Sequence, residues 1–359
     1  MSFTSMEVAI FGASACAAVC AQYAFIRCGL HGSFTSASWP EATLPDVQEL
    51  TRVSNLVLSV YERDVTEPRF SDPVPPACVV KSVSYDDTRG QCPPYTIFLD
   101  LDARDICVAI RGLHLTHEAD YAVLLNNRTG QQRLEDGFAH KGLLQAAWWL
   151  LEREADTLKE LLQSNPGFSL TTSGHSLGSG IAALLTLLLA SSLDRVGDLP
   201  PGKLHCLAFA PPRVVSLNLA VKYSDFITSV VLQDDFLPRT ALPLQLIFGA
   251  ALCLPCLLAF SCMKDTLVPS WVLYQNPGRL YIPGRVLHIV YTKFCSCASL
   301  PPVVKEAVPR EERFEHLVCS MNALQDHSLV RLRAKAQGAV TRLSEPNCAT
   351  MAPAEQVME

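Results

Sequence analysis

The pentapeptide Gly174-His175-Ser176-Leu177-Gly178 holds a serine between two glycines at a spacing suited to nucleophilic chemistry. It matches the pattern Gly-x-Ser-x-Gly, which places a serine on a strained turn between a strand and a helix. Because glycine has no Cβ atom, a strand and a helix can pack closely around such a serine. A helix that begins at Leu177 would direct its first amides toward Ser176, where an oxyanion develops during acyl transfer. The pattern predicts a nucleophilic serine, with a purely structural turn as the alternative.

The turn requires a strand before this pentapeptide and a helix after it, and both flanking segments fit. The preceding "FSLTTSG" reads as a strand, and the following "LGSGIAALLTLLLASSL" reads as a helix that is almost entirely apolar. A helix that is apolar all round must be buried. The order of strand, pentapeptide and helix therefore favours the nucleophile over the simple turn.

A nucleophilic serine needs a histidine as base and a carboxylate that orients the histidine. In this type of site the chain order is serine, acid, histidine. Asp234 and Asp235 follow the strand-like "FITSVVLQ", where the carboxyl edge of a parallel sheet would place an acid. Among the later histidines, His288 lies within a strand-like segment and His316 in "RFEHLV", whereas His327 precedes the last predicted helix in a loop. Position favours His327, and both aspartates remain candidates.

Strands and helices alternate along most of the chain. The periodicity predicts helices over 44–62, 140–163, 177–193 and 328–343, and strands over 95–101, 106–110, 168–174, 204–210, 226–233 and 280–292. Residues 64–94 contain six prolines and no clear period, so an irregular loop is predicted there. This alternation, with nearly continuous apolar strands, predicts an α/β fold with a mostly parallel sheet covered on both faces by helices.

The composition excludes some classes of function and favours others. Of 359 residues, 49% are hydrophobic and 18% charged, and the mean hydropathy of +0.20 indicates contact with a membrane or with lipid. A net charge of -6 without a long basic stripe argues against nucleic-acid binding. Several of the 14 cysteines lie in apolar segments, so the composition favours a reducing compartment. Cys107 and Cys206 are predicted to lie in the core.

Residues 1–44 form an apolar N-terminal segment and a linker. The uncharged run Val8–Ile26 has 19 residues, close to the roughly 20 that cross a bilayer. A buried or amphipathic helix is the alternative, because alanine, serine and Gln22 make the run only moderately apolar. Glu7 before the run is unlike a secretory signal peptide, and Arg27 after it favours a cytosolic location for the rest of the chain.

Seven segments together resemble a known family. "VAIRGLH", "HKGLLQAA", "LTTSGHSLGSGIAALL", "LAFAPPRV", "VVLQDDFLPR", "LYIPGRVLHI" and "QDHSL" occur in the order found in class 3, fungal-lipase-like lipases. The resemblance runs from about Tyr95 to about Leu332. The longer pattern is similar to a plant branch of calmodulin-binding, heat-shock-protein-like class 3 lipases, related to mono- and diacylglycerol lipases.

The resemblance implies an α/β-hydrolase fold and a serine-dependent hydrolase of glycerolipid acyl esters. It makes Ser176 the nucleophile, Asp235 the acid and His327 the base. The segment Arg111-Gly112-Leu113 matches the family's Arg-Gly-Thr or Arg-Gly-Ser, so the backbone amides of Leu113 and Leu177 would form the oxyanion hole. Here the chain departs from the family, because leucine replaces the hydroxyl residue. No cofactor or metal is implied.

The predicted triad constrains the second apolar run, at residues 240–263. This run lies between Asp235 and His327, and a single membrane span there would separate the two side chains. We therefore expect an apolar insertion that enters the lipid interface or covers the acyl pocket. The insertion belongs to a predicted hydrolase domain over residues 45–343, followed by a flexible tail at 344–359.

Two further sequence features have weaker interpretations. Cys253-x-x-Cys256, with three more cysteines at 262, 295 and 297, is a poor match to a zinc site, and S-acylation that adds membrane affinity is the better hypothesis. Residues 328–343 form a basic amphipathic pattern that suits calmodulin or a membrane surface, with an ordinary surface helix as the alternative. A calmodulin-binding interaction protein with a weakly active or inactive lipase fold is the competing hypothesis for function.

Overall fold

An eight-stranded sheet organises the chain. Its order is β1-β2-β3-β6-β7-β8-β9-β12, and β3, β6, β7, β8 and β9 run parallel to one another. The strands are β1 (Val79–Val83), β2 (Tyr95–Asp100), β3 (Asp105–Ile110), β6 (Ser169–His175), β7 (Leu204–Phe209), β8 (Ile227–Leu232), β9 (Arg285–Val290) and β12 (Val303–Ala307). Toward the two edges of the sheet the pairing is antiparallel: β1 pairs with β2, β2 with β3, and β12 with β9. The predicted, mostly parallel sheet is confirmed.

The computed structural model describes residues 36–62, 64, 67–113, 132–197, 199–239, 279–291, 293–295, 298–299, 301–307, 322–323 and 325–345. The apolar run Val8–Ile26, the predicted insertion 240–263, His316 and the tail beyond Glu345 lie outside these residues. Within them, no helix combines the length and apolar character needed to cross a bilayer.

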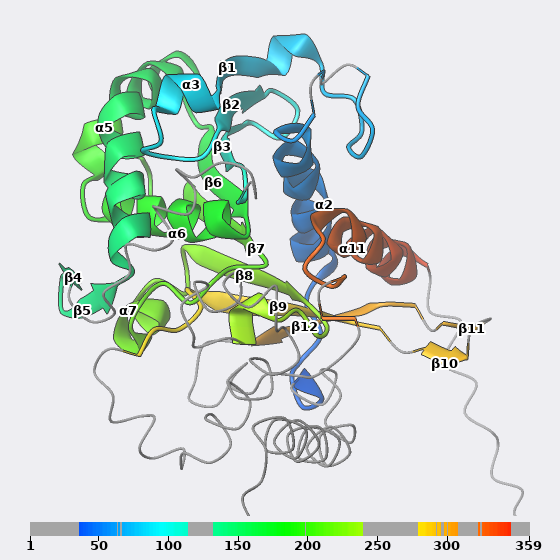
Figure 1. Cartoon of the computed structure of the whole chain (residues 1–359). Helices are drawn as coiled ribbons and strands as arrows, with labels where there is room; N and C mark the ends of the chain where they lie inside the picture. Colours follow the sequence, from blue (N-terminus) through cyan, green and yellow to red (C-terminus); the bar gives the residue numbers. More distant parts are fainter. Residues whose placement is uncertain are drawn as a thin grey trace, which may run out of the picture.

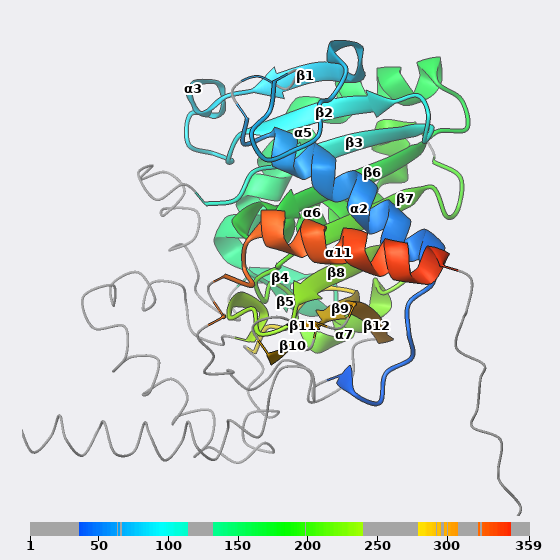
Figure 2. The same cartoon turned by 90° about the vertical axis from the view of Figure 1, so that its right-hand side faces the viewer.

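Helices cover both faces of the sheet (Figure 1). One face carries α5 (Lys141–Ser164), α6 (Leu177–Ala190) and the short α7 (Leu217–Lys222), and the other carries α2 (Leu44–Ser59) and α11 (Leu329–Ser344). Figure 2 shows α2 and α11 lying next to each other across the sheet. Each face has its own apolar core, and all six residues of both β3 and β8 are buried. Strands buried on both faces are expected to be apolar throughout.

The helices begin and end where the sequence provides suitable caps. Thr43 caps α2, and the ring nitrogen Nδ1 of His140 accepts from the amide of Leu143 at the start of α5. These contacts satisfy amides that have no partner inside the helix. The helix α6 is buried along nearly its whole length, as its apolar sequence predicts. Cys107 and Cys206 are buried, which confirms their predicted place in the core.

The prediction of an irregular loop over residues 64–94 is wrong in part. This segment contains a 3₁₀ helix η2 (Pro76–Cys78), the edge strand β1 and a one-turn helix α3 (Tyr85–Thr88). The strand β1 pairs with β2 on one side only, and Val83 alone of its five residues is buried, so it lacks the apolar run of a central strand. Pairing with β2, rather than a local sequence pattern, specifies this strand.

Two short hairpins were also not predicted: β4–β5 (Gln132–Leu134, Gly137–Ala139) and β10–β11 (Lys293–Cys295, Ala298–Ser299).

Candidate functional site

Ser176 lies on a sharp turn between the last residue of β6 and the first residue of α6. Its backbone angles are φ 56° and ψ −122°, a conformation that side-chain-bearing residues rarely adopt and that is stored at functional sites. A Cβ atom on Gly174 would lie 2.5 Å from the carbonyl carbon of Gly178. Glycine at both positions therefore allows strand and helix to approach around the serine, as the pentapeptide pattern predicts.

His327 lies next to Ser176, although 151 positions separate them in the chain. The atom Nε2 of His327 is 3.0 Å from Oγ of Ser176, and Nδ1 is 3.0 Å from Oδ1 of Asp235. The Asp235 side chain is fully buried, whereas that of His327 is 19% exposed. A serine, an imidazole and a buried carboxylate in this order form the geometry of a nucleophile, its base and the acid that orients the base.

The turn after β8 distinguishes Asp235 from its neighbour Asp234. The amide of Leu237 donates to Oδ1 of Asp235 at 3.1 Å, which directs this carboxylate toward His327. Asp234 is equally buried, but its backbone amide donates to the Asp326 side chain at 3.2 Å instead. Of the two candidate aspartates, the structure places Asp235 against the histidine.

A fully buried guanidinium lies among the acids. Arg239, in the 3₁₀ helix η4 (Leu237–Arg239), donates to the carbonyl oxygen of Gln233 at 2.7 Å. Burial lowers the pKa of Arg239 to about 10, although the nearby carboxylates of Asp234 and Asp235 oppose this shift. Arg239 therefore stays positively charged at neutral pH and offsets part of the negative charge that is buried beside His327.

The loop that carries His327 is fixed by the preceding residue, which sequence reasoning did not single out. Asp326 is buried, and its carboxylate accepts from the Asp234 amide and, at 2.8 Å, from the hydroxyl of Tyr291. Arg331 donates to the same hydroxyl at 2.6 Å. Burial raises the pKa of Asp326. These contacts attach the histidine loop to the turn that holds the acid.

The segment after β3 runs beside the serine turn. A Cβ atom on Gly178 would lie 2.5 Å from the carbonyl oxygen of Ile110, so this close approach requires glycine. The amide of Arg111 donates to the carbonyl of Pro94 at 2.9 Å, and that of Gly112 donates to the hydroxyl of Tyr61 at 2.7 Å. Within the described part of the chain, the amides of Arg111 and Gly112 are thus both engaged, and no such bond involves the amide of Leu113.

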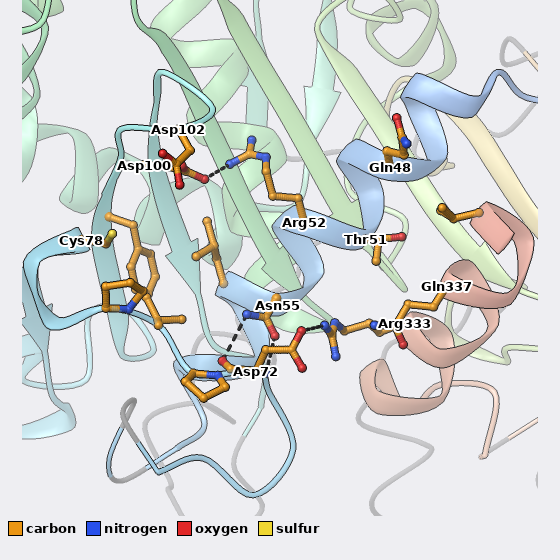
Figure 3. A pocket seen from close by; sticks show the side chains of 16 residues that line it. Gln48, Thr51, Arg52, Asn55, Asp72, Cys78, Asp100, Asp102, Arg333 and Gln337 are labelled. Carbon is orange, nitrogen blue, oxygen red and sulfur yellow. Dashed lines mark hydrogen bonds and ion pairs between the residues drawn. The ribbon is translucent and has the colours of Figure 1, made fainter. Parts of the chain in front are cut away.

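His288, another of the histidine candidates, and a cavity between two helices lie away from the serine. His288 is buried in β9 and bonded to Ser36 and to the carbonyl of Gln233, which confirms that it belongs to the packing of the sheet. A cavity of about 460 Å³ lies between α2, α11 and the end of β2 (Figure 3). Four of the charged side chains that line it form ion pairs, Arg52 with Asp100 and Arg333 with Asp72. It opens near the start of β3, whereas the serine turn adjoins the end of β3.

Residues 107–245 match the family model described as lipase (class 3). Over 151 residues the chain is 31% identical to mouse (Mus musculus) diacylglycerol lipase-beta, a match that covers 41% of this chain and 21% of that protein. It is 26% identical over 243 residues to human (Homo sapiens) diacylglycerol lipase-alpha, covering 55% of this chain and 22% of that protein. The chain thus matches only about a fifth of the length of these relatives.

Solved structures of fungal lipases share the fold. The lipase of Rhizopus microsporus var. chinensis superimposes with a TM-score of 0.54 at 17% identity, covering 80% of this chain and 87% of that one. Rhizomucor miehei triacylglyceride lipase gives 0.54 at 16% identity, covering 80% and 95%. At such low identity the likeness is one of fold, and it confirms the predicted α/β-hydrolase architecture. Taken with the family match over residues 107–245, it makes this chain similar to class 3 lipases in the region that holds Ser176 and Asp235.

Proposed function

We propose that the chain is a carboxylic ester hydrolase that cleaves acylglycerols through Ser176, His327 and Asp235. The observation that carries the proposal is the pair of 3.0 Å contacts, Ser176 Oγ to His327 Nε2 and His327 Nδ1 to Asp235 Oδ1, at a serine held on a strained turn. The match to class 3 lipases and to diacylglycerol lipases supports a glycerolipid substrate.

The proposed reaction begins with attack of Ser176 Oγ on the ester carbonyl carbon. His327 Nε2 takes the hydroxyl proton, and the Asp235 carboxylate stabilises the resulting imidazolium. The amides of Leu113 and Leu177 donate to the oxyanion of the tetrahedral intermediate. The intermediate collapses as His327 returns the proton to the leaving glycerol oxygen. Water, deprotonated by His327, then attacks the acyl-enzyme, and a fatty acid leaves as Ser176 regains its proton.

A panel of mono-, di- and triacylglycerols in mixed micelles tests this proposal, with wild type and Ser176→Ala compared at equal concentration. We expect release of fatty acid by wild type and a loss of at least about 10³-fold in the variant, as for removal of a catalytic serine. Labelling by a fluorophosphonate reports the nucleophile independently of the lipid. Labelling that persists in folded Ser176→Ala would assign the nucleophile elsewhere.

We also propose that the protein acts at a membrane surface with its catalytic domain in the cytosol. The mean hydropathy of +0.20 and the low proportion of charged residues, 18%, favour contact with lipid. Flotation of the full chain with phosphatidylcholine vesicles tests the association. A chain that stays at the bottom of the gradient would argue against it.

Calmodulin binding through residues 328–343 stays a separate hypothesis. The apolar residues Leu329, Leu332, Ala336 and Ala339 of α11 are buried, and the helix packs against α2. Calmodulin binds the apolar face of its target helices, so α11 would have to leave α2 first. Calorimetric titration of the folded chain with calcium-loaded calmodulin tests this, and absence of binding would remove the hypothesis.

A further inference from the structure

The phenol of Tyr61, which lies just beyond the C-terminal end of α2, contacts two parts of the proposed active site. Its hydroxyl oxygen is 2.7 Å from the amide of Gly112 and 3.0 Å from Nδ1 of His175. These residues lie 51 and 114 positions away in the chain. One side chain thus joins the oxyanion segment to the serine turn.

The direction of each hydrogen bond follows from the partners of His175. Its Nε2 lies 2.8 Å from the carbonyl oxygen of His327, which can only accept, so Nε2 carries a proton. Burial lowers the pKa of His175 to about 3, so the ring is neutral and Nδ1 has no proton. The Tyr61 hydroxyl must therefore donate to Nδ1, and its oxygen accepts from Gly112.

The result is a continuous chain of hydrogen bonds across the site. It runs from the Gly112 amide through the Tyr61 hydroxyl and the His175 ring to the backbone of His327. At one end is the residue before Leu113, and at the other is the backbone of the proposed base. Successive hydrogen bonds in a buried site polarise and strengthen one another.

One further contact and the tight packing at Gly112 keep Tyr61 in place. The guanidinium of Arg111 lies 5.0 Å from the centre of the Tyr61 ring, within the range of a cation–π contact. Gly112 leaves no room for a side chain, because a Cβ atom there would lie 2.6 Å from the Tyr61 hydroxyl and 2.8 Å from the carbonyl oxygen of His175. The packing around the phenol is therefore tight, and its hydroxyl has little freedom to move.

We propose that Tyr61 and His175 are positioning residues that hold the Leu113 amide and the His327 backbone in register with Ser176. The proposal rests on the hydrolase function above. Leu113 lacks the hydroxyl found at this position in related lipases. The Tyr61 bond to Gly112 holds the residue before Leu113 and thereby keeps the oxyanion segment in place. Pre-organised donors lose catalytic value when they shift by even about 1 Å.

The test is Tyr61→Phe, which removes the hydroxyl and keeps the ring. We expect kcat on a soluble short-chain ester to fall by about 10- to 100-fold, while KM changes by less than about threefold. The rate of fluorophosphonate labelling should fall by a similar factor. Because the oxyanion donors act on the transition state, the loss should appear in kcat rather than in KM.

Tyr223→Phe is the matched control. This buried phenol also donates to a side chain, Glu135, at 2.6 Å. It lies beside Ser191, which follows the last residue of α6. Ser176 precedes the first residue of this helix, so the two ends are about 20 Å apart for a helix of this length. Tyr223→Phe should lower Tm about as much as Tyr61→Phe does, yet leave kcat within about twofold of wild type.

A second variant, His175→Ala, removes the next member of the chain of hydrogen bonds. Its kcat should fall at least as far as that of Tyr61→Phe, and the double variant should lose less than the product of the two single effects. If Tyr61→Phe and His175→Ala both retain wild-type kcat while Ser176→Ala is inactive, the positioning role is wrong and the hydrolase function stands. If wild type neither hydrolyses esters nor labels, the proposed function fails and the positioning role fails with it.

Discussion

Replacing Asp235 by asparagine removes one charge from the site at nearly constant shape. The amide oxygen can still accept from the Leu237 amide and from Nδ1 of His327, as Oδ1 does in the native protein at 3.1 Å and 3.0 Å. The negative charge that stabilises the imidazolium is lost. For unit charges about 4 Å apart at an effective dielectric constant of about 20, that attraction is worth about 4 kcal/mol. Since each 1.36 kcal/mol is a factor of ten in rate, kcat should fall about 10³-fold.

The assay is hydrolysis of a soluble chromogenic ester, with circular dichroism to establish that each variant is folded. Asp234→Asn is the control, because Asp234 is adjacent and equally buried, and its backbone amide bonds to Asp326, whereas the carboxylate of Asp235 contacts His327. We expect Asp234→Asn to keep kcat within about tenfold of wild type. The opposite ranking, with Asp235→Asn active and Asp234→Asn inactive, would refute the assignment of the acid.

Two further predictions concern the serine turn and acid stability. In Gly178→Ala the new Cβ atom would lie 2.5 Å from the carbonyl oxygen of Ile110. We expect kcat to fall at least about 100-fold and the free energy of unfolding by about 1–3 kcal/mol. Gly202→Ala, at a position with φ +75° but open space around it, should lose some stability and stay active, and full activity of Gly178→Ala would contradict the packing argument. Burial lowers the pKa of His140 to about 4 and those of His175 and His288 to about 3. Below about pH 6.5 the unfolded chain binds protons that the folded chain does not. The free energy of unfolding should therefore decrease as pH falls toward 4, by up to about 1.4 kcal/mol per pH unit for each histidine. Thermal unfolding between pH 7.5 and 4.5 measures this slope. His288→Gln should reduce it by about a third, and a Tm that does not change over this range would contradict the prediction.

The elements around the serine were predictable because their signals are local. The apolar sequence of α6 and the largely apolar sequence of β8 identify buried elements, and the two glycines identify the turn between β6 and α6. The order of the candidate serine, aspartates and histidine along the chain then indicates which side chains form one site. In contrast, β1 depends on its pairing with β2, and its own five residues carry no distinctive pattern.

The support around the proposed triad could not be predicted from the sequence. Tyr61 occurs in a predicted helix that gave no reason to connect it with Gly112, 51 residues later. Asp326 is next to the favoured histidine, but its bond to the Asp234 amide spans 92 positions. Such contacts depend on how distant elements pack, and a single sequence contains no signal for them. The sequence shows a leucine at position 113, where related lipases have a hydroxyl residue. Only the three-dimensional structure shows that Tyr61 bonds to the neighbouring Gly112.

The most direct test of the central proposal is fatty-acid release from a diacylglycerol by the purified 359-residue chain, wild type against Ser176→Ala. The account predicts steady release by wild type, together with fluorophosphonate labelling, and loss of both in a folded Ser176→Ala variant. Folded wild type that neither releases fatty acid nor labels, under conditions in which a fungal lipase does both, would contradict it.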